Sequence, residues 1–252
     1  MILDDIFKER RVQLERERGL YPRRGSFKAA LRKSGGLSII AEVKKASPSK
    51  SVIEPNYDPV KNALAYEQAG AAAVSVLTEE RYFQGSIRDF SDVRAAVGIP
   101  LLRKDFVFDE FQIAQTLFLG GNAVLLIAAM LDSDKLYSLY NFASALGLDC
   151  LVEVHSADEV ARIGFTPDIV GINNRDLTTF DVDLAVTERL AYAVKSRFPE
   201  AVVVSESGMT CASDLRRVRS AGADAVLIGE TLMRSGQSGR TVAEVFGELL
   251  CS

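Results

Sequence analysis

Glu42 and Lys44 are the first candidate functional residues, because they lie at the end of the apolar run that begins at Ser38. Successive side chains of a strand point to opposite faces, so a strand here directs Glu42 and Lys44 to the same side. Two charged groups at the buried end of a strand are unfavourable unless they form an ion pair or take part in function. The two residues are candidates for catalysis, and a structural ion pair at the rim is the alternative.

A second lysine ends another apolar run, where Arg103 and Lys104 follow two leucines. On a strand, one of these two side chains must point inward and the other outward. A second lysine in the pocket of Lys44 is stronger evidence for chemistry than a lone one, because two nearby ammonium groups lower each other's proton affinity. A lysine with a lowered pKa is suited to acid–base catalysis near neutral pH.

The run from Leu151 ends in Glu153 and His155. Glu153 follows apolar positions, so we expect burial to raise its pKa and suit it to proton transfer. His155 is the only histidine in the chain and lies two residues further along. A histidine at a strand end, without a nucleophile motif, more often supports a neighbour by hydrogen bonding than takes part in catalysis. We therefore expect a supporting role.

Asn173 and Arg175 follow a further apolar run, in the segment GINNRD that begins at Gly171. The amide of Asn173 can donate and accept hydrogen bonds, which suits it to orienting a substrate. The guanidinium of Arg175 offers a fork that matches a carboxylate. The alternative is loop structure, because Asn and Asp are common turn residues.

Two glycines follow the last two apolar runs, Gly208 after Ser207 and Gly229 before Glu230. Glycine lets backbone N–H groups approach an anion, and a short helix over 230–234 would add its N-terminal dipole. The sequence thus predicts a phosphate site, to which Ser47 could add a hydroxyl. The carboxylate of Glu230 would repel phosphate, so we expect only its backbone N–H to serve, with the side chain turned away.

Short apolar runs alternate along the chain with amphipathic stretches, a pattern typical of parallel βα units. The segment after the first run, KKASPSKS, lacks the glycines of a dinucleotide-binding open sheet, which favours a closed (β/α)8 TIM barrel. The predicted strands are Ser38–Val43, Ala73–Leu77, Pro100–Lys104, Asn122–Ile127, Asp149–Val154, Asp168–Ile172, Ala201–Glu206 and Ala223–Gly229. The predicted helices between and after them are Pro59–Gly70, Ser86–Val97, Asp109–Leu119, Ser133–Leu146, Ser156–Ile163, Asp183–Ser196, Thr210–Ala221 and Arg240–Leu250.

Residues 1–34 precede the first strand and form a predicted N-terminal helical extension of a single barrel domain that spans 1–252. Leu3, Phe7 and Leu14 recur at helical spacing, and a second short helix is predicted at Phe27–Arg32. The extension could cover the bottom of the barrel, pack alongside it, or cap the site, and periodicity does not decide among these.

The composition excludes several classes of protein. A formal net charge of -4 argues against a general nucleic-acid binder, and no apolar run approaches the roughly 20 residues that span a bilayer. One histidine excludes a multi-histidine metal site, and three scattered cysteines without a CxxC pair fit a reducing cytosol. The chemistry must therefore come from Lys, Glu, Asp, Ser, Asn or Arg.

Several stretches, taken together and in order, resemble the indole-3-glycerol phosphate synthase family. The resemblance implies a TIM barrel without metal or cofactor that converts 1-(o-carboxyphenylamino)-1-deoxyribulose 5-phosphate to indole-3-glycerol phosphate, with loss of carbon dioxide and water, in tryptophan biosynthesis. The stretches are IIAEVKKASPSK (39–50), SVLTEERYFQGS (75–86), LLRKDFVFDEFQI (101–113), LVEVH (151–155), GINNRDL (171–177), SESG (205–208) and LIGETLM (227–233).

The resemblance also implies roles for the residues. Lys104 would be the general acid that protonates the substrate carbonyl for ring closure. Glu153 would handle the proton of the final dehydration, with Lys44 assisting and contacting the substrate carboxylate. Glu42 and Asn173 would orient these groups. The implied substrate-binding residues are Ser47, Phe106, Arg175, Glu206, Ser207, Gly208, Gly229 and Glu230.

Two other functions compete with this hypothesis. Another phosphate-binding barrel enzyme, such as a sugar-phosphate isomerase, would share the glycine cradle but need not have both lysines. A non-catalytic barrel scaffold would have lost charged residues at the strand ends, whereas they are present here. The expected ligand is a small phosphorylated molecule, with no nucleic acid or membrane partner. We expect a cytoplasmic monomer, and association with other enzymes of the tryptophan pathway stays an open alternative.

Overall fold

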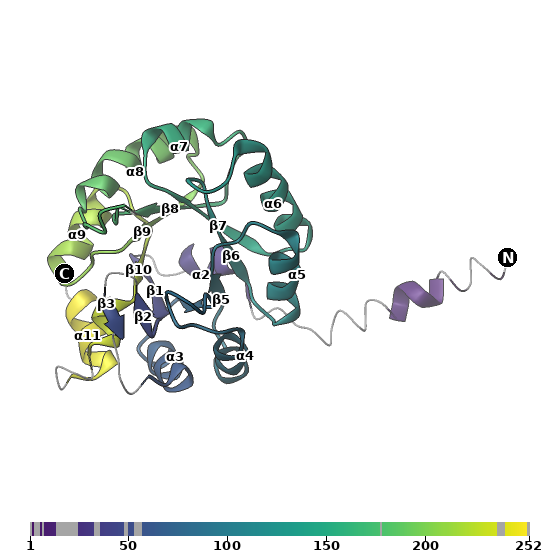
Figure 1. The fold of residues 1–252 in the computed structure, drawn as a ribbon, viewed down its shortest axis with the longest axis horizontal. Coiled ribbons are helices and arrows are strands. Elements are labelled where there is room, and N and C mark those ends of the chain that lie inside the picture. Colours follow the sequence, from purple (N-terminus) through teal and green to yellow (C-terminus); the bar gives the residue numbers. More distant parts are fainter. Residues whose placement is uncertain are drawn as a thin grey trace.

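The structure is a computed structural model that describes residues 2, 6, 8–13, 25–32, 36–47, 50–52, 57–176, 178–235 and 240–250, with the backbone alone at 50–52. Parallel strands close into a barrel in the order β1, β10, β9, β8, β7, β6, β5 and β4, and helices surround it (Figure 1). The predicted (β/α)8 TIM barrel is confirmed. The barrel strands are β1 (Ser38–Val43), β4 (Ala73–Leu77), β5 (Leu101–Lys104), β6 (Ala123–Ile127), β7 (Asp149–Val154), β8 (Ile169–Asn173), β9 (Val202–Glu206) and β10 (Ala225–Ile228).

The predicted outer helices are also present, each with ends close to those expected from sequence. Asp58 begins the first of them by accepting a hydrogen bond from the backbone N–H of Lys61, and Ser86 caps the second in the same way through Asp89. These helices are α3 (Pro59–Gln68), α4 (Ile87–Ala96), α5 (Glu110–Phe118), α6 (Ser133–Ala145), α7 (Ala157–Arg162), α8 (Ala185–Arg197), α9 (Ala212–Ser220) and α11 (Val242–Leu250), and the short α10 (Glu230–Met233) precedes the last.

Both faces of each strand are buried, which explains why the strand sequences are apolar throughout. One row of side chains fills the barrel interior, and the alternate row packs under the helices. The interior cluster includes Ile40, Leu102, Leu125, Leu151 and Val204. The next inward positions, at the carboxyl ends of the strands, carry polar groups instead.

The helix α2 (Phe27–Arg32) closes the bottom of the barrel, because its Phe27 and Leu31 belong to the interior cluster. The backbone N–H of Lys28 donates to the carboxylate of Asp149, at the start of β7. This agrees with the predicted second short helix and with a role at the bottom. For the predicted first helix, residues 8–13 are helical and exposed, whereas Leu3, Phe7 and Leu14 lie outside the described residues.

The loop after β1 contains a two-stranded hairpin that the sequence pattern did not predict, formed by β2 (Ala46–Ser47) and β3 (Lys50–Val52). Each strand is too short to show an alternating pattern, so the sequence carries no signal for it. The hairpin places Ser47 beside the mouth of the barrel, as expected from its position after β1. No helix in the described part of the chain is long and apolar enough to cross a membrane.

Candidate active site

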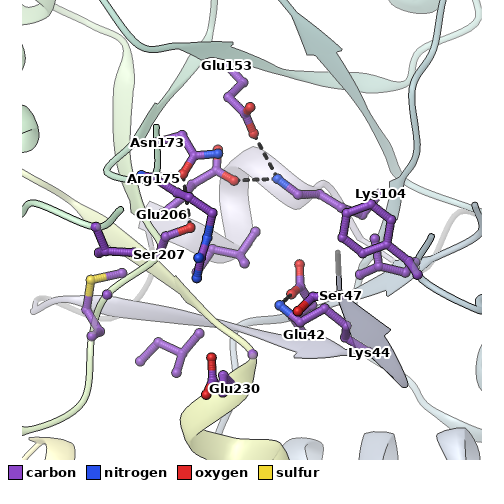
Figure 2. Close-up of a pocket in the computed structure, with 18 of the residues that line it drawn as sticks. Glu42, Lys44, Ser47, Lys104, Glu153, Asn173, Arg175, Glu206, Ser207 and Glu230 are labelled. Carbon is purple, nitrogen blue, oxygen red and sulfur yellow. Dashed lines mark hydrogen bonds and ion pairs between the residues drawn. The ribbon is translucent and has the colours of Figure 1, made fainter. Parts of the chain in front are cut away.

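A cavity of about 740 Å³ opens at the carboxyl ends of the barrel strands, a size typical of small-molecule sites. Side chains from several strands converge on it (Figure 2). Every residue predicted for the site lines this cavity: Glu42, Lys44, Ser47, Lys104, Phe106, Glu153, Asn173, Arg175, Glu206, Ser207, Gly208, Gly229 and Glu230. The structure thus brings the predicted residues together, and their roles stay predictions.

The interior periodicity of the strands explains this convergence. Leu102 faces the barrel interior, so Lys104, two residues further along β5, faces the same way. The same step of two leads from Leu151 to Glu153 on β7 and from Val204 to Glu206 on β9. The catalytic candidates therefore form a polar layer at the carboxyl ends of the strands, directly above the apolar layers that fill the barrel interior.

Lys104 is the inward member of the Arg103–Lys104 pair. Its Nζ lies 3.0 Å from Oε2 of Glu153 and 2.5 Å from Oε2 of Glu206, and Figure 2 shows it reaching both carboxylates. The two carboxylates are almost completely buried, with side-chain exposures of 3% and 2%. A single ammonium group thus bridges two acids drawn from strands far apart in sequence.

Arg103 points outward under the helices and serves the loop after β5. Its Nη2 donates to Oδ2 of Asp105 at 2.9 Å, and its Nε donates to Oγ1 of Thr78 at 3.0 Å. The same guanidinium also reaches the side chain of Gln115 on α5. This buried network fixes the backbone that follows Lys104, a structural role that the sequence pattern did not reveal.

The pKa shifts differ from those expected from sequence. Burial lowers the pKa of Lys104, but the charges of Glu153 and Glu206 raise it by more, so the net shift is upward. The expected lowering by Lys44 is wrong, because Lys44 Nζ is paired with Oε1 of Glu42 at 2.7 Å. The dominant neighbours of Lys104 are carboxylates instead of a second ammonium group.

The two acids beside Lys104 shift in opposite directions. Burial raises the pKa of Glu153, but the charges of Lys104 and His155 lower it by more, so the expected net rise is wrong. Burial raises the pKa of Glu206 to about 7, because the neighbouring charge of Glu153 adds to it and Lys104 offsets only part. Glu206 is therefore the acid that can carry a proton near neutral pH.

Gly171 makes room for Glu206, a function that the sequence analysis did not find. A Cβ atom on Gly171 would lie 2.1 Å from Oε1 of Glu206, far inside van der Waals contact. The position faces the interior beside Glu153, its register partner on β7. The signal was present in the sequence, since a glycine inside an apolar strand often marks a close approach.

Asn173 and Ser207 form a polar wall next to the acids. Ser207 Oγ donates to Oδ1 of Asn173 at 2.9 Å, and the same Oδ1 accepts from the backbone N–H of Arg175. The guanidinium of Arg175 donates to the carbonyl of Phe180 at 3.0 Å. Asn173 is therefore held in one orientation, and Arg175 also closes the loop after β8.

The predicted anion cradle lies along the ends of β9 and β10. Ser207 and Gly208 both line the cavity and have positive φ angles, of 67° and 90°. Gly229 begins α10, and a Cβ there would lie 2.6 Å from Oε1 of Glu42. Other side chains thus leave no room for a Cβ atom at either glycine. The predicted role of the two glycines, to let backbone N–H groups approach an anion, stays a prediction.

Glu230 carries the negative charge that conflicted with a phosphate site. Its Oε1 lies 3.0 Å from Nε of Arg234, one helical turn further on. Glu230 still lines the cavity, so its charge is offset by Arg234 and not removed from the site. Arg234 also lines the cavity and was missed in the sequence analysis, although its position four residues after Glu230 in the predicted helix over 230–234 was a signal for the pair.

Comparison with known proteins agrees with this geometry. A model of the family described as indole-3-glycerol phosphate synthase matches residues 4–245. The chain belongs to the indole-3-glycerol phosphate synthase family. An indole-3-glycerol phosphate synthase from Geobacillus thermodenitrificans is 51% identical over 90% of this chain and 88% of its own length. Another, from Halalkalibacterium halodurans, is 43% identical over 98% of this chain and 97% of its own.

The structural comparison supports the fold alone. A chain from the tryptophan synthase α2β2 complex of Pyrococcus furiosus superposes with a TM-score of 0.62, over 84% of this chain and 97% of that one, at 15% identity.

Membership of the indole-3-glycerol phosphate synthase family makes the protein a carboxy-lyase of tryptophan biosynthesis. The described residues contain no group of three or more His, Cys, Asp or Glu side chains placed to hold a metal ion, and a reaction without metal or cofactor stays a prediction.

Proposed function

We propose that Lys104 and Glu153, with Lys44 assisting, carry out the acid–base chemistry of the indole-3-glycerol phosphate synthase reaction in this cavity. The observation that supports the proposal is the position of the Lys104 ammonium, inside the cavity and within 3.0 Å of both Glu153 and Glu206. The substrate is 1-(o-carboxyphenylamino)-1-deoxyribulose 5-phosphate, a small phosphorylated molecule.

Ring closure comes first. The aromatic carbon that bears the carboxylate attacks the ketone carbon, and Lys104 gives a proton to the ketone oxygen as it becomes a hydroxyl. The raised pKa keeps Lys104 charged at neutral pH, so the acid is present in its protonated form. A neighbouring carboxylate can return a proton to Lys104 afterwards, and Glu206, with a pKa of about 7, is suited to do so.

Decarboxylation and dehydration follow. Loss of carbon dioxide leaves its bonding electrons in the ring, and loss of the new hydroxyl as water, with one C–H proton, completes the indole. Glu153 is ionised in the free enzyme, because Lys104 and His155 lower its pKa, so it first acts as a proton acceptor. It can donate a proton only after taking one up, and Lys104 at 3.0 Å is an adjacent source.

The substrate anions are assigned to two ends of the cavity. The ammonium of Lys44, next to Glu42, would contact the substrate carboxylate. The phosphate would bind at the backbone of Ser207, Gly208 and Gly229, which line the cavity next to the start of α10. Ser47 and Phe106 would border the bound substrate, and Asn173 would hold its hydroxyls.

A direct assay tests these assignments. Purified protein is mixed with the carboxyphenylamino-deoxyribulose phosphate, and indole fluorescence is followed against the dark background of a chain without tryptophan. We expect Lys104→Met and Glu153→Gln each to lower kcat by roughly 10²- to 10⁴-fold. Lys195→Met, which alters an ion pair on α8 outside the cavity, is the control. Near-normal turnover by a site variant removes that residue from the mechanism, and absence of product with the wild type contradicts the proposal.

The setting of the enzyme completes the proposal. We expect a cytoplasmic monomer that needs neither nucleic acid nor membrane. Light scattering coupled to size-exclusion chromatography measures the mass directly, and repeating it with other tryptophan-pathway enzymes tests for association.

A further inference from the structure

The single histidine of the chain lies directly behind the active-site acid Glu153. His155 Nε2 is 3.4 Å from Oε1 of Glu153, and His155 Nδ1 is 3.5 Å from Oε2 of Glu159. The other oxygen of Glu153 faces Lys104. His155 does not line the cavity, and its side chain is only 15% exposed. It can therefore act on the reaction only through Glu153.

Glu159 holds the imidazole from the opposite side and is itself fixed. Its Oε2 accepts from the backbone N–H of His155 at 2.9 Å, and its Oε1 accepts from Oγ of Ser156 at 3.1 Å. Ser156 and Glu159 have the spacing of a capping box. The structure keeps half of it, since Glu159 N–H donates to Ser156 Oγ, but the carboxylate reaches one residue further back, to His155. The start of α7 is thus built around the histidine.

The distances favour the charged form of the imidazole. Both N···O separations exceed the 2.7–3.2 Å of a good N–H···O hydrogen bond, so a neutral ring gains little from them. The attraction between an imidazolium and a carboxylate falls only as the inverse of distance and persists at this range. A ring with one carboxylate at each nitrogen, and only slight contact with water, is therefore placed as a cation.

We propose that His155 is a positioning residue which, as an imidazolium clamped between Glu159 and Glu153, keeps Glu153 ionised and directed at Lys104. The proposal rests on the role assigned to Glu153 above. It makes the start of α7 part of the catalytic apparatus, through a line of alternating charges that runs from Glu159 through His155 and Glu153 to Lys104.

The charges around His155 act in the same direction. Burial lowers the pKa of His155, but Glu159 on α7, Glu153 on β7 and Glu206 on β9 raise it by more. The backbone N–H groups of Thr179 and Thr178 chiefly lower the pKa of Asp176, in the loop after β8, and the charge of His155 adds a smaller lowering. Loss of the imidazolium proton as pH rises should therefore weaken the hold on Glu153 and lower the rate.

An NMR titration measures the pKa of His155 without any assay of activity. Because the chain has one histidine, protein labelled with ¹³C- and ¹⁵N-histidine gives a single imidazole signal, whose pH titration reports His155 alone. We expect a pKa above 6.5 in the wild type and a lower value in Glu159→Gln. A wild-type pKa at or below 6.5, or a value unchanged in Glu159→Gln, overturns the proposal.

Kinetics test the link to the reaction. We expect His155→Gln to lower kcat by about 10- to 100-fold with KM nearly unchanged. We also expect it to remove from the pH profile of kcat the alkaline step at the pKa that NMR measures for His155. Asp132→Ala, which removes the cap of α6, is the control for lost helix stability and should keep both kcat and its pH profile. If Glu153→Gln loses the rate but His155→Gln keeps the wild-type kcat and profile, the inference fails while the proposed function stands. Full activity in Glu153→Gln contradicts the proposed role of Glu153, and with it the inference about His155 that rests on that role.

Discussion

Replacing Lys104 by methionine should make the stability of the protein depend steeply on pH. The ammonium of Lys104 lies between the carboxylates of Glu153 and Glu206, whose side chains are 3% and 2% exposed. Methionine fills a similar volume but carries no charge. The variant would then hold both buried carboxylates without the cation that lies between them, and at least one of them should take up a proton on folding.

The size of the effect follows from the cost of that proton. A glutamate with an ordinary pKa of about 4.3 costs about 1.4 kcal/mol per pH unit to protonate, which is roughly 3.7 kcal/mol at pH 7. This agrees with the roughly 3–5 kcal/mol lost when one partner of a buried ion pair is removed. We therefore expect Lys104→Met to lower the free energy of unfolding by about 3–4 kcal/mol at pH 7.

The sign of the pH dependence is the sharper test. In the variant, the folded pKa of a buried carboxyl is raised above its unfolded value, so its contribution is present at low pH and is lost as pH rises. In the wild type, the pKa of Glu153 is lowered, so its contribution is present above the unfolded pKa and is lost as pH falls. The two proteins should differ least near pH 5, and the gap should widen by about 1.4 kcal/mol per pH unit for each carboxyl that is protonated in the folded variant but ionised in the folded wild type.

Urea unfolding followed by far-ultraviolet circular dichroism at pH 5, 6, 7 and 8 measures these free energies. The matched control is Lys195→Met, because Lys195 also pairs with a carboxylate, Asp224 at 2.7 Å, but both side chains are partly exposed. An exposed pair contributes about 0–1 kcal/mol, so the control should run nearly parallel to the wild type. Parallel curves for Lys104→Met and the wild type would refute the buried-charge reasoning.

Two further predictions concern the space and the proton of Glu206. Gly171→Ala places a methyl group 2.1 Å from Oε1 of Glu206, and we expect it to lower the free energy of unfolding by about 1–3 kcal/mol and to reduce kcat. The control is Gly164→Ala, whose added methyl group has no atom within 4 Å and should change neither quantity. Equal behaviour of the two variants contradicts the assigned role of Gly171. Glu206→Gln removes a carboxyl whose folded pKa is about 7. The free energy of unfolding of the wild type, measured by urea titration, should therefore fall relative to that of the variant as pH rises from about 4.5 to 7. A constant difference over that range would show that Glu206 does not titrate there.

The sequence alone determined the barrel and the membership of the site. Strands buried on both faces must be apolar throughout, and the inward row repeats every second residue, so the polar groups that end each run can be assigned to one mouth. For this reason Glu42, Lys104, Glu153 and Asn173 could be assigned in advance to the cavity that they line. The hairpin after β1 was not, because strands of two and three residues carry no periodic signal.

Only the tertiary structure decided the state of the charges. Coulomb interactions depend on distances between atoms, and Lys104 is 49 residues from Glu153 and 102 from Glu206 in the chain, so no local pattern pairs them. From the presence of two lysines, the sequence analysis predicted that Lys44 lowers the pKa of Lys104. In the fold, carboxylates surround Lys104 and raise its pKa. Residue types and their spacing fix which groups reach the cavity, but closure of the barrel across its interior fixes which of them hold protons.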